Sequence, residues 1–336
     1  MDRRIVSCRW CGIPSLIPLS AQFLHCPTCQ QVTHLTGQPG YTAAYCRPYN
    51  QWNMATPQLI QPQYGRKRAL LCGITYKGHN RSLRGSVNDV LYMKNLLLHT
   101  FNFPPSSILV LTEEEKHPSF IPTKKNIRAA MQWLVQGCQS GDSLVFHYSG
   151  HASQVRDRDW DEVDGFDESL LPVDYETEGR ILDDEINATI VRPLPRGATL
   201  HSIVDTCFSG TLMDLPNICR MNRDGYYKWE DHRTLHAYKG TSGGYAICIS
   251  ACDDHQNSGD TTAFTGAHVG ALTYSFYRTL REQPRLTYAQ LLSMMHKKID
   301  AARQQVGLTS NEPHKSQEPL LSSSYKFDIH SKAITL

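Results

Sequence analysis

A histidine and a cysteine stand at the ends of two predicted strands. His151 follows the apolar run 142–150, and Cys207 closes the apolar run 198–207. Chemistry in a parallel α/β sheet lies beyond the carboxyl ends of its strands, so we expect both side chains at one edge. An imidazole beside a thiol can accept the thiol proton and create a thiolate nucleophile. The residue types alone leave a second interpretation open, an inert packed thiol and a histidine that is only hydrogen-bonded.

Zinc hydrolysis is a poor interpretation of His147 and His151. Their spacing matches the metal-binding H-E-x-x-H motif, but that motif needs a helix. Gly150 and the apolar strand before it argue against a helix here. We therefore do not expect a metallopeptidase.

Four cysteines near the N-terminus form a C-x2-C-x14-C-x2-C pattern. Each C-x-x-C can direct two thiolates to one point, and two such pairs complete a tetrahedral zinc site that folds a short segment. A redox C-x-x-C normally occurs once within a βαβ unit, which this region lacks. Redox chemistry and four unliganded thiols are the weaker alternatives. The pattern predicts structural Zn2+ on Cys8, Cys11, Cys26 and Cys29.

Carboxylates are concentrated in residues 157–168, DRDWDEVDGFDE. They do not form an EF-hand, because an alignment from Asp157 puts Glu162 where the loop needs glycine. Hard oxygen ligands from separate loops can still bind Ca2+. The alternative is a solvated acidic loop followed by a helix that starts at Asp183 and Asp184.

The elements that must position these residues alternate between strands and helices. Short apolar runs predict strands at 68–76, 107–112, 142–150, 198–207, 245–252 and 319–327. Helical spacing predicts helices at 87–99, 124–138, 267–282 and 287–304. This order is typical of an α/β fold with a mostly parallel sheet and helices on both faces.

Composition divides the chain into three segments. Residues 1–36 hold the four cysteines of the predicted zinc finger. Residues 37–65 are rich in Pro, Gln and Tyr without periodicity, which predicts a flexible linker. The α/β domain follows at 66–336.

Composition and charge also narrow the class of protein. The 336 residues are 40% hydrophobic with a formal net charge of +2, enough for a sizeable core and without the basic stripe of a nucleic-acid binder. No apolar run reaches the ~18 residues of a membrane span, and the start lacks the apolar stretch of a secretory signal. The 11 cysteines form no dense disulfide framework, which favours reduced thiols. We expect a cytoplasmic protein, with the nucleus as the alternative, and neither nucleic-acid nor membrane partners.

Five motifs together resemble the metacaspases, the caspase-like cysteine peptidases of plants, fungi and protists. The paired catalytic motifs are HYSGHA at 147–152 and DTCFSG at 205–210. LRGSVNDV at 83–90 resembles the motif after the first strand, and DGFDESLLPVD at 164–174 with ILDDEI at 181–186 resembles the acidic motif. The motifs occur in the family's order. The zinc-finger and Pro/Gln-rich prodomain resembles plant type I metacaspases in particular.

The resemblance implies a caspase-like sandwich over 66–336, in relatives that are generally monomers. It divides this domain into a large-subunit region of about 66–214, a polar, irregular linker of 215–244 and a small-subunit region of about 245–336. Such peptidases cut themselves, so we expect self-cleavage near Arg66–Arg68 or in the linker. The linker candidates are Arg220, Arg223, Lys228, Arg233 and Lys239.

The motifs imply that Cys207 is the nucleophile and that His151 is the general base and then the general acid. Attack of the thiolate on the scissile carbonyl gives an acyl-enzyme that water hydrolyses. Backbone N–H groups of Cys207 and Ala152 would hold the oxyanion. His147 is expected to pack in or near its strand without a chemical role.

By resemblance, four residues line the S1 pocket: Asp89, Ser149, Asp205 and, where many relatives carry Cys, Ser86. Strand alternation puts Asp205 on the same face as Cys207. Two carboxylates in a partly buried pocket repel each other unless a cation enters, and guanidinium fits them best, ammonium next. Cleavage after Arg or Lys is therefore expected. A carboxylate at a helix N-terminus is the alternative role for Asp89.

Four acidic positions match the calcium ligands of the family: Asp167, Asp183, Asp184 and Asp214. Their mutual repulsion would keep the acidic loop misplaced until Ca2+ binds. The resemblance thus implies a calcium-dependent cysteine endopeptidase that acts on protein substrates in regulated cell death or stress responses.

Three residues depart from the usual family motifs. Ala152 replaces the Gly after the catalytic His, and its methyl group would be strained if that position needs a positive φ. Phe208 replaces the His that usually follows the nucleophile, and Thr206 replaces a Ser. The departures support a second interpretation, a zinc-finger adaptor whose weak or inactive peptidase-like domain regulates a protein partner by binding. Activity that depends on Cys207 separates the two interpretations.

Overall fold

The computed structural model describes residues 3–7, 14–25, 32–34, 67–157, 162, 165–207, 209–221, 226–233, 238–251, 260–264, 268–305 and 319–336. The chain divides into two compact units, Met1–Leu59 and Ile60–Leu336. The four predicted zinc ligands and the predicted linker 37–65 lie outside the described residues.

The N-terminal unit contains two antiparallel strand pairs. β1 (Arg3–Ser7) pairs with β2 (Pro14–Pro18), and β3 (Phe23–His25) pairs with β4 (Val32–His34). In the sequence, each C-x-x-C falls between the two strands of one pair.

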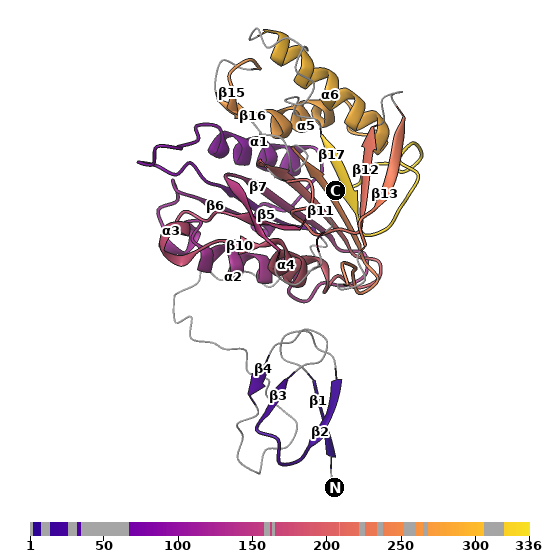
Figure 1. The fold of residues 1–336 in the computed structure, drawn as a ribbon. Coiled ribbons are helices and arrows are strands. Elements are labelled where there is room, and N and C mark those ends of the chain that lie inside the picture. The colour runs from indigo at the N-terminus through magenta and orange to yellow at the C-terminus, as the bar shows by residue number, and fades with distance from the viewer. Residues whose placement is uncertain are drawn as a thin grey trace. The chain divides into compact units, whose positions relative to one another are not determined.

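An eight-stranded sheet forms the centre of the second unit (Figure 1). The first five strands from one edge are parallel, and the last three are antiparallel to their neighbours. In order across the sheet the strands are β6 (Ile108–Thr112), β5 (Lys67–Gly73), β7 (Ser143–Ser149), β11 (Thr199–Asp205), β14 (Tyr245–Ser250), β17 (Leu320–Ser323), β12 (Asn217–Met221) and β13 (Tyr227–Asp231).

Helices cover both faces of this sheet, so apolar side chains of its central strands are buried on each face. One face carries α1 (Ser86–His99), α5 (Ala271–Glu282) and α6 (Tyr288–Gln305). The other carries α2 (Lys124–Val135), α4 (Asp183–Ile186) and the π-helical turn η3 (Asn187–Val191). The predicted α/β architecture, a mostly parallel sheet between two helical layers, is confirmed.

The connections add short elements that the sequence patterns did not predict. They comprise the helical turns η1 (Pro105–Ser107), η2 (Pro118–Phe120) and α3 (Tyr175–Glu178) and the strand pair β15 (Asp260–Thr261) and β16 (Val269–Gly270). The helix predicted from residue 267 begins at Ala271, directly after β16. No helix in the described ranges is long and apolar enough to span a membrane.

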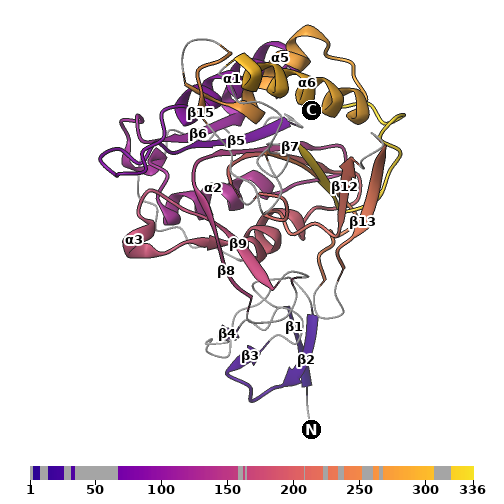
Figure 2. The same cartoon turned by 45° about the horizontal axis from the view of Figure 1, so that its top comes forward.

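A second, three-stranded antiparallel sheet begins directly after β7. It consists of β8 (Ala152–Arg156), β9 (Phe166–Leu170) and β10 (Ile181–Leu182), and Figure 2 shows β8 beside β9. β9 lies within the acidic motif and β10 leads into Asp183, so the polar sequence around them conceals their β structure. The sheet places that motif on a fixed scaffold.

From its polar sequence we predicted that the stretch 215–244 is irregular. Part of it instead forms two strands. β12 and β13 form an antiparallel pair that joins the central sheet through β17. Tyr227 and Trp229 alternate along β13 and pack against the core, and Nε1 of Trp229 donates a hydrogen bond to the carbonyl of Phe327, at 2.9 Å. Burial on one face alone is enough to fix this edge strand.

Candidate active site

The register of two neighbouring strands brings the predicted dyad to one edge of the sheet. β7 and β11 are parallel, and Ser149 is paired with Asp205. His151 and Cys207 each follow two residues after this pair, and both are half-buried. A thiol and an imidazole with access to solvent therefore leave adjacent strand ends, as a nucleophile and its base require.

The imidazole of His151 is oriented by a backbone carbonyl. Its Nε2 lies 2.6 Å from the oxygen of Arg81, and its ring centroid lies 4.6 Å from that of Tyr76. Because a carbonyl oxygen can only accept, Nε2 must carry the proton, which leaves the lone pair of the neutral ring on Nδ1. Nδ1 is thus the atom that can take a proton from a thiol.

Two buried tyrosines hold the backbone of His151, and the sequence patterns gave no signal for either. The N–H of His151 donates to the hydroxyl of Tyr76 (2.8 Å), and the hydroxyl of Tyr148 donates to the carbonyl of His151 (2.9 Å). The Tyr76 hydroxyl donates its own proton to the carbonyl of Leu171 (2.6 Å). Tyr76 itself has a φ of 52°, and the carboxylate of Glu113 accepts from its N–H at 2.8 Å. The general-base candidate therefore sits on a fixed backbone.

The predicted departures from the family motifs do not strain the described part of the site. Ala152 opens β8 and is not among the described residues with a positive φ, so its methyl group fits the local conformation. Thr206 is fully buried. Phe208 lies outside the described residues. Ala152 therefore gives no conformational reason to expect a damaged site.

His147 is buried inside β7, as predicted. Its Nε2 lies 3.2 Å from Oγ1 of Thr273, and burial lowers the pKa of His147 from 6.5 to about 3. The imidazole is therefore neutral at physiological pH.

Three of the predicted S1 residues meet around one glycine. The Ser149 hydroxyl donates to Oδ2 of Asp89 (2.7 Å), and the N–H of Gly270 donates to Oδ1 of Asp89 (2.8 Å). The N–H of Thr273 donates to Oδ2 of Asp205, also at 2.8 Å. A Cβ on Gly270 would lie 2.2 Å from Oδ2 of Asp205 and 2.6 Å from Oδ2 of Asp89. The two buried carboxylates therefore face the same small volume.

The fourth predicted S1 residue, Ser86, opens α1 one turn before Asp89. Its side chain is fully buried, and its hydroxyl has no hydrogen-bond partner in the structure. Helical spacing puts Ser86 and Asp89 on one face of α1. The structure thus keeps all four predicted residues near the strand ends and adds Gly270, whose role no sequence pattern could indicate because its partners are 65 to 181 residues away.

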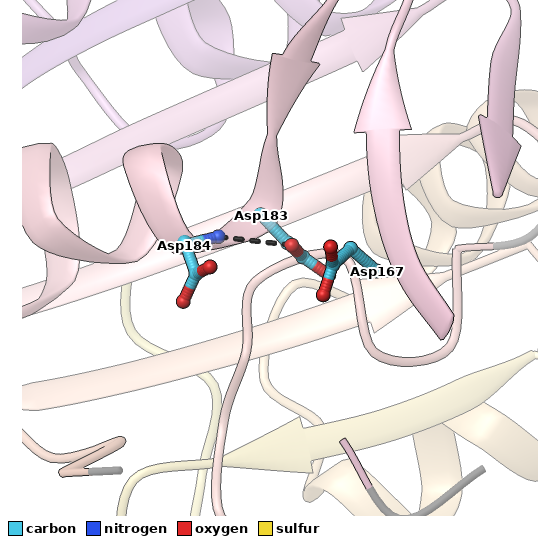
Figure 3. A group of neighbouring side chains, drawn as sticks. All are labelled: Asp167, Asp183 and Asp184. Atoms are coloured by element: carbon cyan, nitrogen blue, oxygen red, sulfur yellow. Dashed lines mark hydrogen bonds between the residues drawn. The ribbon is translucent and has the colours of Figure 1, made fainter. Parts of the chain in front are cut away.

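Three of the four predicted calcium ligands come together at the acidic motif. Carboxylate oxygens of Asp167, Asp183 and Asp184 lie within 4.8 Å of one another (Figure 3). Backbone N–H groups of Glu168 and Asp184 donate to the Asp183 carboxylate at 2.7 and 2.9 Å. Clustered carboxylate oxygens are the donors that Ca2+ prefers, so these residues fit a calcium ion.

The fourth predicted ligand, Asp214, is bound to a lysine that we had not connected with this site. Nζ of Lys239 lies 2.5 Å from Oδ1 of Asp214 and 2.6 Å from Oε1 of Glu162. Burial raises the pKa of Asp183 well above its ordinary value, and the carboxylates of Asp214 and Glu168 raise it further. Asp214 therefore belongs to the same electrostatic cluster as the other three, with its carboxylate already paired.

Comparison with known proteins places the chain in a family. Residues 67–216 match the model of the metacaspase, peptidase C14 domain. The chain is 46% identical to metacaspase-3 of Arabidopsis thaliana, over 100% of this chain and 99% of the relative, and 47% identical to metacaspase-1 of the same plant, over 99% and 96%. A crystal structure of a Geobacter sulfurreducens protein covers 78% of this chain and 94% of its own, with a TM-score of 0.53 and 20% identity, which supports the fold. The chain belongs to the metacaspase family of cysteine peptidases.

Proposed function

We propose that the chain is a calcium-dependent cysteine endopeptidase that cleaves after Arg or Lys. The observation that carries the proposal is the pair of buried carboxylates, Asp89 and Asp205, beside the strand ends that carry Cys207 and His151. Metacaspase relatives and the resemblance of the motifs support a role in regulated cell death or stress responses.

In the proposed reaction, Nδ1 of His151 takes the thiol proton of Cys207. The thiolate attacks the scissile carbonyl, and the backbone N–H groups of Cys207 and Ala152 stabilise the oxyanion. His151 returns the proton to the leaving amine, which gives an acyl-enzyme. Water activated by the same imidazole then releases the acid and restores the thiol.

The proposed specificity follows from the charge of the pocket. Asp89 and Asp205 are both buried carboxylates, and they accept hydrogen bonds from the Ser149 hydroxyl and from backbone N–H groups. A substrate guanidinium would supply the opposite charge with a planar fork that suits paired carboxylates, and an ammonium would supply it as a point charge. An aspartate substrate would meet two like charges.

We further propose two metal ions with different tasks. Ca2+ would bind Asp167, Asp183 and Asp184, where it would offset their repulsion and hold the acidic motif in place. Zn2+ would bind the thiolates of Cys8, Cys11, Cys26 and Cys29 and stabilise the N-terminal unit, which would be free to bind a protein partner. The ligand spacing and the strand pairs on either side of each C-x-x-C support this assignment.

Self-cleavage is the third part of the proposal. Among the described basic residues of 215–244, Lys228 and Arg233 are exposed, whereas Lys239 is buried. Exposed sites are the easier targets, and the prodomain junction at Arg66–Arg68 remains a candidate.

The test is hydrolysis of matched peptide reporters that end in Arg, Lys or Asp, with Ca2+ or with a chelator. We expect cleavage after Arg and Lys only with Ca2+, and a loss of at least about 1,000-fold in Cys207→Ala. Cys138→Ala, which removes another half-buried thiol, is the control and should retain activity. Cleavage after Asp would refute the pocket assignment. A folded, calcium-loaded protein that cleaves none of the reporters would favour the zinc-finger adaptor.

A further inference from the structure

The ammonium of Lys239 is buried within the acidic cluster. Its Nζ lies 2.6 Å from Glu162 and 2.5 Å from Asp214. The side chains of Lys239, Glu162 and Asp214 are only 4%, 7% and 4% exposed. Little water screens such a group, so removal of one partner leaves uncompensated buried charge. Lys239 is therefore a structural counter-ion rather than a solvated surface lysine.

Asp214 is tied to the helix that carries two of the candidate calcium ligands. Nδ2 of Asn187 donates to the carbonyl of Asp214 (2.9 Å), and Asn187 directly follows α4, which begins with Asp183 and Asp184. Asp214 has a φ of 50°, a left-handed conformation that costs a residue other than glycine about 1 kcal/mol. The fold thus ties the backbone of Asp214 to the segment that follows α4, at some cost in backbone energy.

We propose that Lys239 is a tethered cation of this cluster, and that Ca2+ displaces its ammonium from Asp214. The proposal rests on the calcium site of the proposed function. Ca2+ takes about six to eight oxygen ligands, so three aspartates leave coordination positions for Asp214. An oxygen that already lies 2.5 Å from an ammonium cannot also bind a divalent ion unless two cations approach closely, which Coulomb repulsion opposes. Calcium and Lys239 therefore compete.

Displacement would act on two segments of the peptidase domain. Lys239 belongs to the stretch between the large-subunit and small-subunit regions, and it is buried although the neighbouring Tyr238 is exposed. On the other side, the hydroxyl of Thr211, four residues after Cys207, donates to the Glu168 carboxylate of the cluster. Replacement of the Lys239 ammonium by Ca2+ would thus affect both the stretch 215–244 and the segment that follows Cys207.

Calcium titration of full-length Cys207→Ala protein, which cannot cut itself, tests the competition. We compare this protein with versions that also carry Lys239→Met or, as the control, Lys228→Met, which alters an exposed lysine of β13. Isothermal titration calorimetry should give a Kd about tenfold lower for Lys239→Met, a difference of about 1.4 kcal/mol, and an unchanged Kd for Lys228→Met.

A second readout leaves Lys239 intact, so it does not depend on how the variant folds. Acetylation of the Cys207→Ala protein with an amine-reactive reagent is followed by mass spectrometry of each lysine. Lys239 should be protected without Ca2+ and become reactive with it, whereas Lys228 should react equally in both conditions. Calcium binding with an unchanged Kd in Lys239→Met and continued protection of Lys239 would overturn the displacement but not the calcium site. An absence of calcium binding in every version would overturn both.

Discussion

Two groups of buried carboxylates in the peptidase domain differ in what surrounds them. In the substrate pocket, Asp89 and Asp205 accept hydrogen bonds from a serine hydroxyl and from backbone N–H groups. In the acidic cluster, Asp214 and Glu162 share the ammonium of Lys239. Aspartates of similar burial thus accept hydrogen bonds from neutral groups in one place and contact a cation of the same chain in the other.

The difference indicates where each group finds its positive charge. These donors are neutral and orient the pocket carboxylates, and in the proposed function a basic substrate side chain would supply the opposite charge. His147, which contacts Thr273 beside Asp205, adds no positive charge at neutral pH, because burial lowers the pKa of His147 to about 3. The acidic cluster contains a cation of its own, Lys239, with which the proposed Ca2+ would exchange. In this proposal the substrate pocket takes up a basic substrate side chain, whereas the acidic cluster exchanges the Lys239 ammonium for Ca2+.

Removal of a pocket carboxylate should have the largest effect. Asp205→Asn or Asp89→Asn leaves a substrate guanidinium without part of its counter-charge, and the loss of one partner of a buried charge pair costs roughly 2–5 kcal/mol. We expect kcat/KM for the Arg reporter to fall about 100-fold. Labelling of Cys207 with iodoacetamide should proceed as in the wild type, since the nucleophile is intact. An equal loss with a reporter that has a neutral residue before the scissile bond would contradict the charge argument.

Gly270→Ala tests whether the two carboxylates share one volume. The added methyl group would meet Asp205 and Asp89 oxygens at 2.2 and 2.6 Å, so one carboxylate must move. Overpacking of this kind costs about 1–3 kcal/mol. We expect about a tenfold lower kcat/KM for the Arg reporter at an unchanged Kd for Ca2+. Wild-type activity of the variant would show that the pocket does not depend on the close approach at Gly270.

The neutral His147 predicts a smaller effect, on stability. Because its pKa is lowered from 6.5 to about 3 in the folded chain, the unfolded chain binds more protons between these values. The free energy of unfolding should therefore fall as the pH drops below 6.5, by up to about 1.4 kcal/mol per pH unit from this group.

Urea unfolding at a series of pH values measures this slope. His147→Gln should have a flatter profile below pH 6.5 than the wild type. Identical profiles for His147→Gln and the wild type would mean that His147 takes up a proton in the folded domain, and the pocket would then have an internal cation after all.

The central sheet was predictable because its strands are buried on both faces. Runs such as 142–150 and 198–207 each contain a cluster of apolar residues, and their ends locate His151 and Cys207. β8 to β10 and the pair β12–β13 were missed, because strands that bury one face or carry functional acids lack that signal. β13 keeps its place with only Tyr227 and Trp229 against the core.

The candidate site was predictable to the extent that its chemistry is local in the sequence. Asp205 and Cys207 share a strand end, and Asp183 and Asp184 share a helix start, so motif and spacing locate them. Tyr76 and Arg81 were missed, although they hold the backbone and the ring of His151, because their contacts cross 70 or more residues of chain.

The sequence by itself determined the residue types that can carry out the chemistry, the strands that bring them to one edge, and membership in the metacaspase family. Only the tertiary structure decided which charges are compensated. Lys239 reads as one more basic residue of a polar stretch, and Gly270 as a small residue between two elements. Compensation depends on distances of a few Å between segments far apart in the chain, and those distances are set by the packing of strands and helices, which no local pattern records.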